Sequence, residues 1–475
     1  MSILRLRVIC ALASLLTLPL WSATVQILAT GDMHGWLEPQ ITDGQVYGGP
    51  GQMLAYWKTA EKYVPQKFLV VSCGDIATGP TLSTVFKGQP AVEMMNLMGY
   101  DLSVVGNHEF DFGEEGLKKL TQWARFPFLA GNLRNADGTM SSMVGNSLLY
   151  EEQGVKVGVI ALTVKDLARY ANIGSLKVQA YADAVRALAA GLRGRGAKTI
   201  IIAAHAEMAA LEKLANDVAD LNIPLILGGH SHEFGQKKVG DTWVINSGEW
   251  WKGYSRIDLE VDSEEGTALV RAAKQVWLQQ DAKGVKIDRQ AAELIETWTK
   301  RLPAEDREII AYTATGLTRH WGIANLVVDS WLAIHPADVA IVNMGGLRQD
   351  FAPGAIRRMD LYGVMPFNNS LLRMKLTGKQ LADYQPPGEI LHYGGLRIKD
   401  GHLLFAGQPL NPAETYRILI IDYLYNTSPH LKTADPNPER VDDHWRNPVI
   451  RWLTAHQTDK KTTLESLTDL LPRSE

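Results

Sequence analysis

Short apolar runs alternate with helical patterns through the first half of the chain, and this alternation restricts the possible folds more than any other feature. The runs that have the length of a buried strand are 24–30, 68–73, 102–105, 155–162, 199–204 and 224–227. The segments that show a helical pattern between them are 91–100, 113–125, 181–193 and 208–221. Such alternation is typical of helices packed on a largely parallel sheet. We therefore expect an α/β fold for this half of the chain.

The rest of the chain predicts an edge, a linker and a second domain. Residues 243–248 and 254–262 look like antiparallel strands that close an edge of the sheet. Residues 286–307 are charged and helical without strand character, which indicates a helical linker. Strand-like and helical runs mix after Ile309, which favours an α+β domain. The expected units are a signal peptide and three further segments, 1–23, 24–285, 286–308 and 309–475.

The first 23 residues have the pattern of a secretory signal peptide. Arg5 and Arg7 precede an uncharged apolar run at 8–21, and small residues follow at Ser22 and Ala23. The run is shorter than the ~18 residues that a membrane span needs. We expect export to the periplasm or medium and no membrane span after cleavage; an uncleaved anchor is the alternative.

Charge and cysteine content narrow the possible partners. The chain has 48 basic and 52 acidic residues, and removing a signal peptide with two arginines makes it more acidic. No basic run or aromatic–basic stripe suggests a nucleic-acid groove, so we expect no nucleic-acid polymer as a partner. Cys10 lies in the predicted signal peptide, which leaves Cys73 without a disulfide partner in the mature chain. We expect a buried, inert thiol there.

Polar side chains follow five of the predicted strands at the point where each strand ends. These residues are Asp32, His34, Asp75, Asn107, His205, His230 and His232. Because the carboxyl ends of parallel strands meet at one edge of a sheet, we expect these side chains to lie close together. A single residue of this kind is more often a turn residue or a structural histidine. Five such signals in one domain are hard to obtain by accident.

The chemistry of this residue set favours a pair of metal ions. Carboxylate, amide and imidazole groups suit Zn²⁺, Mn²⁺ or Fe, and the set is too rich in nitrogen for a calcium site. The carboxylates of Asp32 and Asp75 would cancel part of the charge of two divalent ions. This donor set matches two-metal hydrolysis, in which one carboxylate bridges the ions.

The order of these motifs resembles that of a known superfamily. D-x-H, GD, GNHE, a later His and GHxH resemble the calcineurin-like metallophosphoesterases. GNHEFDFG and GEWWKGYSRIDL are similar to the bacterial 5′-nucleotidase/UDP-sugar hydrolase family, as are NMGGLR at 343–348 and VMPFNN at 364–369. The resemblance covers nearly the whole mature chain. It implies an N-terminal metallophosphoesterase sandwich, a helical linker and a C-terminal α+β 5′-nucleotidase-type domain.

The resemblance also implies a role for each residue. One metal would be held by Asp32, His34, Asp75 and His232. The other would be held by Asp75, Asn107, His205 and His230. His108 and Asp111 would form the catalytic dyad, and Glu109 would be structural. Substrate binding would fall to Asn343, Arg348, Phe367 and Tyr423, with the two aromatic residues enclosing a base.

Several positions differ from the family pattern around the predicted nucleotide pocket. Leu317 stands where the family has an arginine, and Arg319 follows two residues later. NTSPHLK at 426–432 replaces a glycine-rich turn, and the segment at 385–395 is shortened. His232 stands where typical 5′-nucleotidases carry Asn or Gln, whereas other metallophosphoesterases and the related thiosulfohydrolases of sulfur oxidation carry His. These differences indicate that the phosphate-ester chemistry is retained while the nucleotide pocket is remodelled.

We therefore expect an exported two-metal phosphohydrolase that acts on nucleotides or similar small phosphate esters through a metal-activated water. A first alternative keeps the metals and changes the substrate to a cyclic nucleotide or to a thiosulfonate on a carrier protein. A second alternative is a metal-containing binding module without turnover. The sequence does not indicate an oligomeric state.

Overall fold

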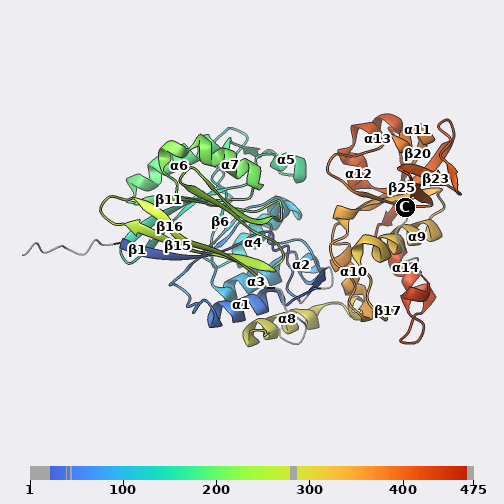
Figure 1. Ribbon diagram of the computed structural model, residues 1–475, viewed down its shortest axis with the longest axis horizontal. Coiled ribbons are helices and arrows are strands. Elements are labelled where there is room, and N and C mark those ends of the chain that lie inside the picture. The colour runs from blue at the N-terminus through green and yellow to red at the C-terminus, as the bar shows by residue number, and fades with distance from the viewer. Residues whose placement is uncertain (1–21, 39, 43–44, 279–285, 468–475) are drawn as a thin grey trace, which may run out of the picture.

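The computed structural model describes residues 22–38, 40–42, 45–278 and 286–467. The predicted signal peptide lies outside these residues except for its last two positions, which begin the first strand. Figure 1 shows two domains side by side, with residues up to about the yellow part of the colour bar in one and the orange and red residues in the other. No helix in the described part of the chain is long and apolar enough to cross a membrane.

Two six-stranded sheets face each other in the first domain. The strands of the first sheet are, in spatial order, β16 (Ala268–Trp277), β15 (Gly253–Asp262), β1 (Ser22–Thr30), β4 (Leu69–Ser72), β5 (Leu102–Val104) and β6 (Phe128–Leu129). Those of the second are β13 (Phe234–Val239), β14 (Thr242–Ser247), β12 (Leu225–Gly228), β11 (Thr199–Ala204), β9 (Val155–Leu162) and β8 (Ser147–Glu152). The expected sandwich is thereby confirmed, and the expectation of one sheet edge for the site is replaced by the ends of two sheets.

The core between the sheets consists mainly of β-branched and leucine side chains. Val25, Ile27 and Val71 of the first sheet pack with Val157 and Ile201 of the second, and all are fully buried. Such side chains suit a pleated surface that is covered on both faces. The predicted runs at 155–162 and 199–204 coincide with β9 and β11.

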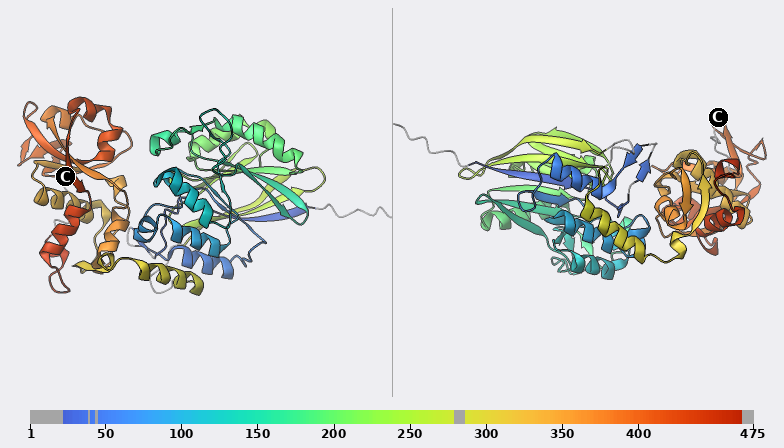
Figure 2. Two further views of the ribbon diagram at one scale, coloured as in Figure 1. Left: turned by 180° about the vertical axis from the view of Figure 1, so that it is seen from behind. Right: turned by 90° about the horizontal axis from the view of Figure 1, so that it is seen from below.

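Helices cover the outer faces of both sheets (Figures 1 and 2). On the side of the first sheet lie α1 (Gly49–Thr59), α3 (Gln89–Met98) and α4 (Gly113–Trp123). On the side of the second lie α6 (Tyr181–Gly194) and α7 (Met208–Asp217). Each turns an apolar face inward; Val185 and Leu192 of α6, for example, pack on Ile200.

The strands predicted at 243–248 and 254–262 to be antiparallel and to close an edge are only partly as expected, and neither lies at an edge. β14 runs parallel to β12, with Leu225 opposite Trp243, and antiparallel to β13. β15 lies in the other sheet, antiparallel to β1 and β16. The two segments are adjacent in sequence, but the chain crosses from one sheet to the other between them.

The predicted linker is a helix that packs on the first domain. In α8 (Arg289–Arg301), the carboxylate of Asp288 caps the start by accepting from the backbone N–H groups of Gln290 and Ala291. Trp298 is buried, and its Nε1 donates to Glu93 Oε2 at 2.9 Å. The helix ends before Pro303, and a separate 3₁₀ turn follows at Glu305–Arg307.

The second domain is built around a mixed five-stranded sheet. Its strands are, in spatial order, β21 (Leu391–Gly394), β18 (Val339–Asn343), β25 (Thr415–Ile421), β20 (Ser370–Thr377) and β26 (Glu439–His444). Trp331 and Val327 of α9 (Ala324–Ile334) and Leu453 of α14 (Asn447–His456) belong to its core. β25 ends at Ile421, where helix α12 (Asp422–Thr427) begins.

Shorter elements connect these units. They are β2 (Gln40–Thr42), β3 (Gln45–Tyr47), α2 (Thr81–Val85), η1 (His108–Phe110), β7 (Leu133–Arg134), α5 (Leu167–Tyr170), β10 (Lys177–Val178), η2 (Ala219–Leu221), β17 (Ile309–Thr313), η4 (Arg319–Ile323), η5 (Met344–Gly346), β19 (Gly354–Arg357), α10 (Arg358–Val364), α11 (Gly378–Ala382), β22 (Leu396–Lys399), β23 (His402–Phe405), β24 (Gln408–Pro409), α13 (Pro429–Ala434) and η6 (Leu464–Ser466).

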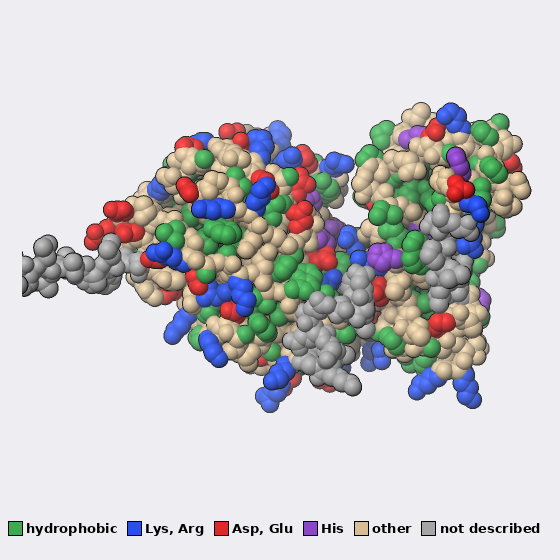
Figure 3. Space-filling model, in the orientation of Figure 1, with side chains coloured by type: hydrophobic (Ala, Val, Ile, Leu, Met, Phe, Trp, Pro, Cys, Tyr) green, Lys and Arg blue, Asp and Glu red, His purple; other side chains and the backbone are tan. Residues whose placement is uncertain are grey.

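The two domains touch at α2 and α10. Thr81 Oγ1 donates to the carbonyl oxygen of Met359 at 2.6 Å, and both groups are buried. Nearby, burial raises the pKa of Glu38 to about 7, and Asp360 of the second domain adds to this rise. The space-filling view shows a deep groove between the domains beyond this contact, with histidine side chains (purple) visible in it (Figure 3).

Candidate metal centre

The seven predicted metal ligands lie at the ends of five strands drawn from both sheets. Asp32, His34, Asp75 and Asn107 follow β1, β4 and β5 of the first sheet. His205, His230 and His232 follow β11 and β12 of the second. The ends of the two sheets meet here, so residues as far apart in the sequence as 34 and 232 come into contact.

The backbone of this site is strained at several ligands. The residues with a positive φ are Asp32 (49°), His34 (48°), Asp75 (53°), His230 (74°) and His232 (60°). This left-handed conformation costs energy for residues other than glycine, and it persists where surrounding contacts enforce it. Backbone hydrogen bonds do so: Asp32 N–H donates to Gly74 O at 3.1 Å, and His34 N–H to Asp75 O at 2.8 Å.

Gly106, which precedes Asn107, is required by the same crowding. A Cβ atom at this position would lie 2.2 Å from Asp75 Oδ1. Any side chain would therefore displace the carboxylate around which the site is built. This accounts for the glycine of the GNHE motif.

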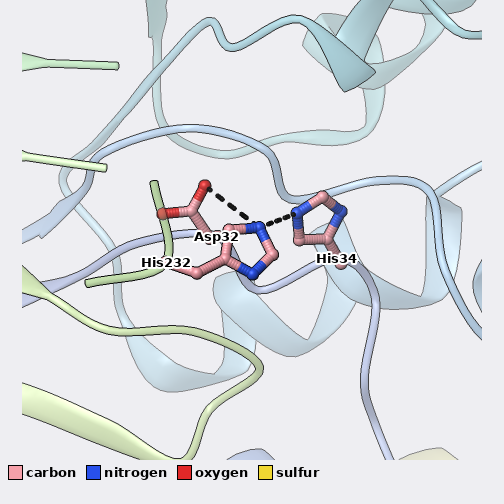
Figure 4. Close-up of side chains that lie close together, drawn as sticks. All are labelled: Asp32, His34 and His232. Atoms are coloured by element: carbon pink, nitrogen blue, oxygen red, sulfur yellow. Dashed lines mark hydrogen bonds and ion pairs between the residues drawn. The ribbon is translucent and has the colours of Figure 1, made fainter. Parts of the chain in front are cut away.

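The first ligand group consists of Asp32, His34 and His232 (Figure 4). His34 Nε2 lies 3.1 Å from His232 Nε2, which in turn lies 3.9 Å from Asp32 Oδ1. Asp32 Oδ2 is buried without a hydrogen-bond partner among the residues that the structure describes. Burial raises the pKa of Asp32 to about 6, against the opposing effect of His232.

The second group consists of Asp75, His205 and His230, with Asn107 beside them. His205 Nε2 lies 3.0 Å from Asp75 Oδ2, 3.2 Å from His230 Nδ1 and 3.2 Å from Asn107 Oδ1. Asp75 Oδ2 also lies 3.9 Å from His34 Nε2. Asp75 therefore stands between the two groups.

The orientation of the imidazole rings shows that these residues fit a cation. His34 Nδ1 lies 3.1 Å from Thr78 O and His205 Nδ1 lies 2.8 Å from Cys73 O. A carbonyl oxygen only accepts, so each Nδ1 carries a hydrogen and each Nε2 faces the site, where the neutral form of the ring offers a lone pair to a cation. His232 is fixed in the same way by a carboxylate at its Nδ1. Lone pairs of His34 and His232 thus face each other at 3.1 Å, which is favourable with a positive ion between them.

The pKa values of His205 and Asp75 also indicate that the site favours a positive charge. Burial lowers the pKa of His205, but Asp75 outweighs it and brings the value to about 9. Burial raises the pKa of Asp75, but His205 and His108 hold it well below its usual range. A protein without metal would hold a proton where these residues offer ligands to an ion.

His108 and Asp111 form a hydrogen-bonded pair beside the second ligand group. His108 Nδ1 lies 2.8 Å from Asp111 Oδ2, and its backbone N–H donates to Asp75 Oδ1 at 2.9 Å. Burial lowers the pKa of His108, but Asp111 and Asp75 outweigh burial and raise it to about 10. The ring is therefore charged at neutral pH in the absence of metal and holds a proton at the edge of the site.

Glu109 joins the loop after β4 to the loop after β5. Its carboxylate accepts from the backbone N–H groups of Asp75 (3.0 Å), Ile76 (2.7 Å) and Gly106 (2.6 Å). These contacts agree with the structural role expected for it. Cys73 is also fully buried, and burial raises the pKa of its thiol, so it is protonated and unreactive.

Glu249 is a residue that the motif analysis missed. Its carboxylate accepts from His232 Nδ1, and its other oxygen lies 3.1 Å from the ammonium of Lys252. Lys252 is buried against the Trp250 ring, with its Nζ 4.0 Å from the ring centre. Burial raises the pKa of Glu249, but His232 and Lys252 lower it to about 2. An ionised carboxylate thus fixes the tautomer of His232. Glu249 lies in GEWWKG, a segment that resembles a family motif but does not by itself indicate this contact.

Replacing Glu249 by glutamine is expected to weaken metal binding at the first group by about 10- to 100-fold. The amide no longer carries the charge that makes His232 a stronger ligand, and its N–H₂ group can face Nδ1. Competition with a chromogenic chelator, with Zn²⁺ or Mn²⁺ as the probe, measures the affinity. Glu233→Gln is the matched control, since Glu233 is exposed and adjacent to His232. Equal affinities for wild type and Glu249→Gln would contradict the assignment.

Predicted substrate residues of the second domain lie next to this centre. The Phe367 ring lies 6.1 Å from the His108 ring, and the Arg348 guanidinium lies 5.0 Å from the centre of Phe367. Burial lowers the pKa of Arg348, and Arg319 lowers it further, so the two arginines share one region. Leu317, by contrast, is buried in the core of its domain.

Asn343 and Tyr423 meet at a residue that was not predicted. Asn343 Nδ2 donates to Glu389 Oε2 at 2.9 Å, and the Tyr423 hydroxyl donates to Glu389 Oε1 at 3.1 Å. Tyr423 is 44% exposed, so it is not a core aromatic residue. The structure thus links the four predicted substrate residues in two pairs, Arg348 with Phe367 and Asn343 with Tyr423.

Two family models match this chain. Residues 25–234 match the calcineurin-like phosphoesterases, and residues 309–430 match the C-terminal domain of 5′-nucleotidases. The chain therefore contains a calcineurin-like phosphoesterase domain followed by a 5′-nucleotidase C-terminal domain. The expected family and the expected class, a metal-dependent phosphoester hydrolase, are thereby confirmed for this phosphoesterase.

Among similar proteins, the 5′-nucleotidase of Vibrio vulnificus is 25% identical over 75% of this chain and 76% of its own length. Protein UshA of Escherichia coli is 25% identical with the same coverage. Endonuclease YhcR of Bacillus subtilis is 25% identical over 77% of this chain, which spans only 33% of that protein.

Solved structures share the fold of this phosphoesterase. A 5′-nucleotidase precursor from Thermus thermophilus superposes with a TM-score of 0.77 at 21% identity and covers 95% of this chain and 99% of its own. The sulfate thiohydrolase SoxB of Thermus thermophilus gives 0.75 at 17% identity, with coverage of 95% and 96%. A 5′-nucleotidase precursor and a sulfate thiohydrolase therefore share this architecture.

Proposed function

We propose that this phosphoesterase is an exported two-metal phosphohydrolase that cleaves phosphate esters of nucleotides or similar small molecules. The observation that carries the proposal is the convergence of seven ligand side chains from both sheets, with lone pairs held 3.1 Å apart. The proposed ligands of one ion are Asp32, His34, Asp75 and His232. The proposed ligands of the other are Asp75, Asn107, His205 and His230.

Divalent ions bound here, such as Zn²⁺, Mn²⁺ or Fe, would act as Lewis acids and lower the pKa of a water molecule. His108 holds a proton on its Nε2, because Asp111 occupies Nδ1 at 2.8 Å. That proton can stabilise negative charge on the phosphoryl group or pass to the leaving oxygen. Asp111 orients the ring and supports its charge, and the Phe367 ring beside His108 keeps water from that side.

Binding of the substrate is proposed for the second domain. The planar guanidinium of Arg348 is suited to phosphate or carboxylate oxygens. Phe367 and Tyr423 would contact an aromatic group, and Asn343 would donate to it. The names of the Vibrio and Escherichia relatives support a nucleotide substrate. The proposal also includes export directed by a signal peptide at 1–23. It includes three further units: a metallophosphoesterase domain at 24–285, a helical linker at 286–308 and a substrate domain at 309–475.

Metal analysis combined with a substrate panel tests this function. The panel consists of AMP, UDP-glucose, a cyclic nucleotide and a thiosulfonate. We expect two ions per chain and turnover of AMP that is lost with a chelator and restored by Mn²⁺ or Zn²⁺. Preference for the thiosulfonate would favour the alternative substrate, a thiosulfonate on a carrier protein, which the histidine at position 232 also suggests. Undiminished activity without metal, or bound metal without turnover of any panel member, would contradict a two-metal hydrolase.

A further inference from the structure

Glu389 lies between two residues of the proposed substrate pocket. Its two carboxylate oxygens accept separately, one from Asn343 Nδ2 at 2.9 Å and one from the Tyr423 hydroxyl at 3.1 Å. It belongs to 385–395, the segment in which this chain is shorter than the family pattern. Its position in the pocket therefore depends on a part of the chain that the family motifs do not describe.

Neighbouring strands in the sheet of the second domain bring these residues together. β18 and β25 are parallel neighbours, so Asn343 at the end of β18 and the start of α12 after Ile421 lie at the same edge. β21 runs antiparallel to β18 with Leu391 opposite Asn343. Met344 N–H donates to Ile390 O at 2.8 Å, which fixes the backbone next to Glu389. These backbone contacts place Glu389 beside Asn343 and Tyr423, whose side chains hold its carboxylate.

The pocket contains opposite charges at separate positions. Burial lowers the pKa of Arg348, and the negative charge of Glu389 counteracts this effect. Burial raises the pKa of Tyr423 to about 12, with Glu389 the next largest cause, so Tyr423 keeps its proton and donates it to the carboxylate. Arg348 can pair with an anionic group of a ligand, whereas the negative charge of Glu389 repels an anionic group placed beside it. The two residues therefore impose a direction on any ligand that carries a phosphate.

An ionised carboxylate has about four positions at which it can accept a hydrogen bond. The contacts with Asn343 and Tyr423 account for two of them. The others can accept from a ligand, and a carboxylate is well suited to two adjacent donors. A carboxylate also repels an anionic group at the same place, so it acts by attraction and by exclusion.

We propose that Glu389 determines the substrate class of this phosphoesterase. The class is a phosphate ester whose organic part presents N–H or O–H donors, or a positive charge, and no second anion at this position. This inference rests on the proposed function, since it concerns the pocket beside the same metal centre. Donors of this kind can come from a base or from a sugar, and the experiment distinguishes the two sources.

Ratios of kcat/KM for paired nucleotides test the proposal. GMP and XMP differ in the base, where a 2-amino donor is replaced by a carbonyl oxygen; GMP and 2′-deoxy-GMP differ in one sugar hydroxyl. We expect wild type to prefer GMP in at least one pair, and Glu389→Gln to reduce that preference by about tenfold or more. The pair that responds identifies the source of the donors. Ratios that change less than about twofold in both pairs would overturn the proposal.

A matched control and a reference substrate separate specificity from other effects. Glu414 accepts from the Tyr416 hydroxyl at 3.4 Å, next to the start of β25 and so at the opposite end of that strand from Tyr423. Glu414→Gln removes a similar carboxylate–tyrosine contact away from the pocket and should leave both ratios unchanged. An equal fall for GMP, XMP and p-nitrophenyl phosphate in Glu389→Gln would also contradict a role in specificity.

Failure of the proposed function would appear differently. If wild type with bound metal hydrolyses none of these esters, the phosphohydrolase is rejected. Binding of guanosine and xanthosine, measured by calorimetry on wild type and Glu389→Gln, then tests the pocket without turnover. A preference for guanosine that disappears in the variant would support the recognition of donors, and equal binding in both proteins would reject it.

Discussion

Asp75→Asn is expected to lower phosphoesterase activity by on the order of 10³-fold and to reduce the metal content of the protein. The carboxylate of Asp75 lies between the two ligand groups, 3.0 Å from His205 Nε2 and 3.9 Å from His34 Nε2. Its other oxygen accepts the backbone N–H of His108. An amide removes the negative charge and places donor hydrogens where the site needs acceptors. Metal analysis and kcat on a chromogenic phosphate ester measure both effects.

The control for this variant is Asp101→Asn, which changes a carboxylate at the far end of the same sheet. Asp101 accepts from the backbone N–H of Val70 at 2.7 Å, and burial raises its pKa to about 6. This substitution removes the same charge without touching the ligand groups. A stable Asp75→Asn protein that keeps two ions and full activity would show that Asp75 does not bridge the ions.

His108→Ala is expected to retain the metal ions and lose about 10²- to 10⁴-fold in kcat. The imidazole lies beside both ligand groups, and its Nδ1 is engaged by Asp111 at 2.8 Å. Its proton is therefore available to the reacting group, while the ligands keep their own hydrogen bonds. Steady-state kinetics and metal analysis on the same preparation give the two quantities.

A parallel loss of metal in His108→Ala would assign His108 a different role. His108, His34 and Asp75 lie close enough together that His108 could itself hold an ion. Metal content that falls in proportion to activity would make it a ligand rather than a proton donor. His402→Ala is the control, because His402 is exposed on β23 of the second domain.

The strands of the first domain, and the proposed ligand residues at their ends, could be located in the sequence because their signals are local. The apolar run at 155–162 coincides with β9, and GNHE follows β5 as expected. A buried strand must be apolar along its length, and a metal ligand must stand where the strand reaches the edge of the sheet. Both requirements leave a pattern within a few consecutive residues.

Pairing of the strands could not be predicted from such patterns. β14 pairs with β12 in one sheet, whereas β15 pairs with β1 in the other, although the two segments follow each other closely. Both are apolar because both face the core of the sandwich, and nothing in their composition records the choice of partner.

Residues that support the site through other side chains could not be identified from sequence motifs either. Glu249 acts through His232, and Glu389 acts beside Asn343 and Tyr423, so each depends on a contact between distant segments. A single glutamate in a loop has no distinguishing pattern, and the usual expectation for it is exposure to solvent. Only the folded chain shows that these carboxylates have specific partners.

The attachment of α8 limits where the molecule can bend. Because Trp298 is anchored to Glu93 and Asp288 to Lys58, this helix moves with the first domain as a rigid extension. Any rotation that opens the groove must be absorbed by the few residues between Arg301 and Ile309, which include Pro303. The hinge is thus short and lies at one side of the molecule. The second domain would rotate about it as one body, and this rotation would move Arg348 and Glu389 together toward or away from the histidines of the metal centre.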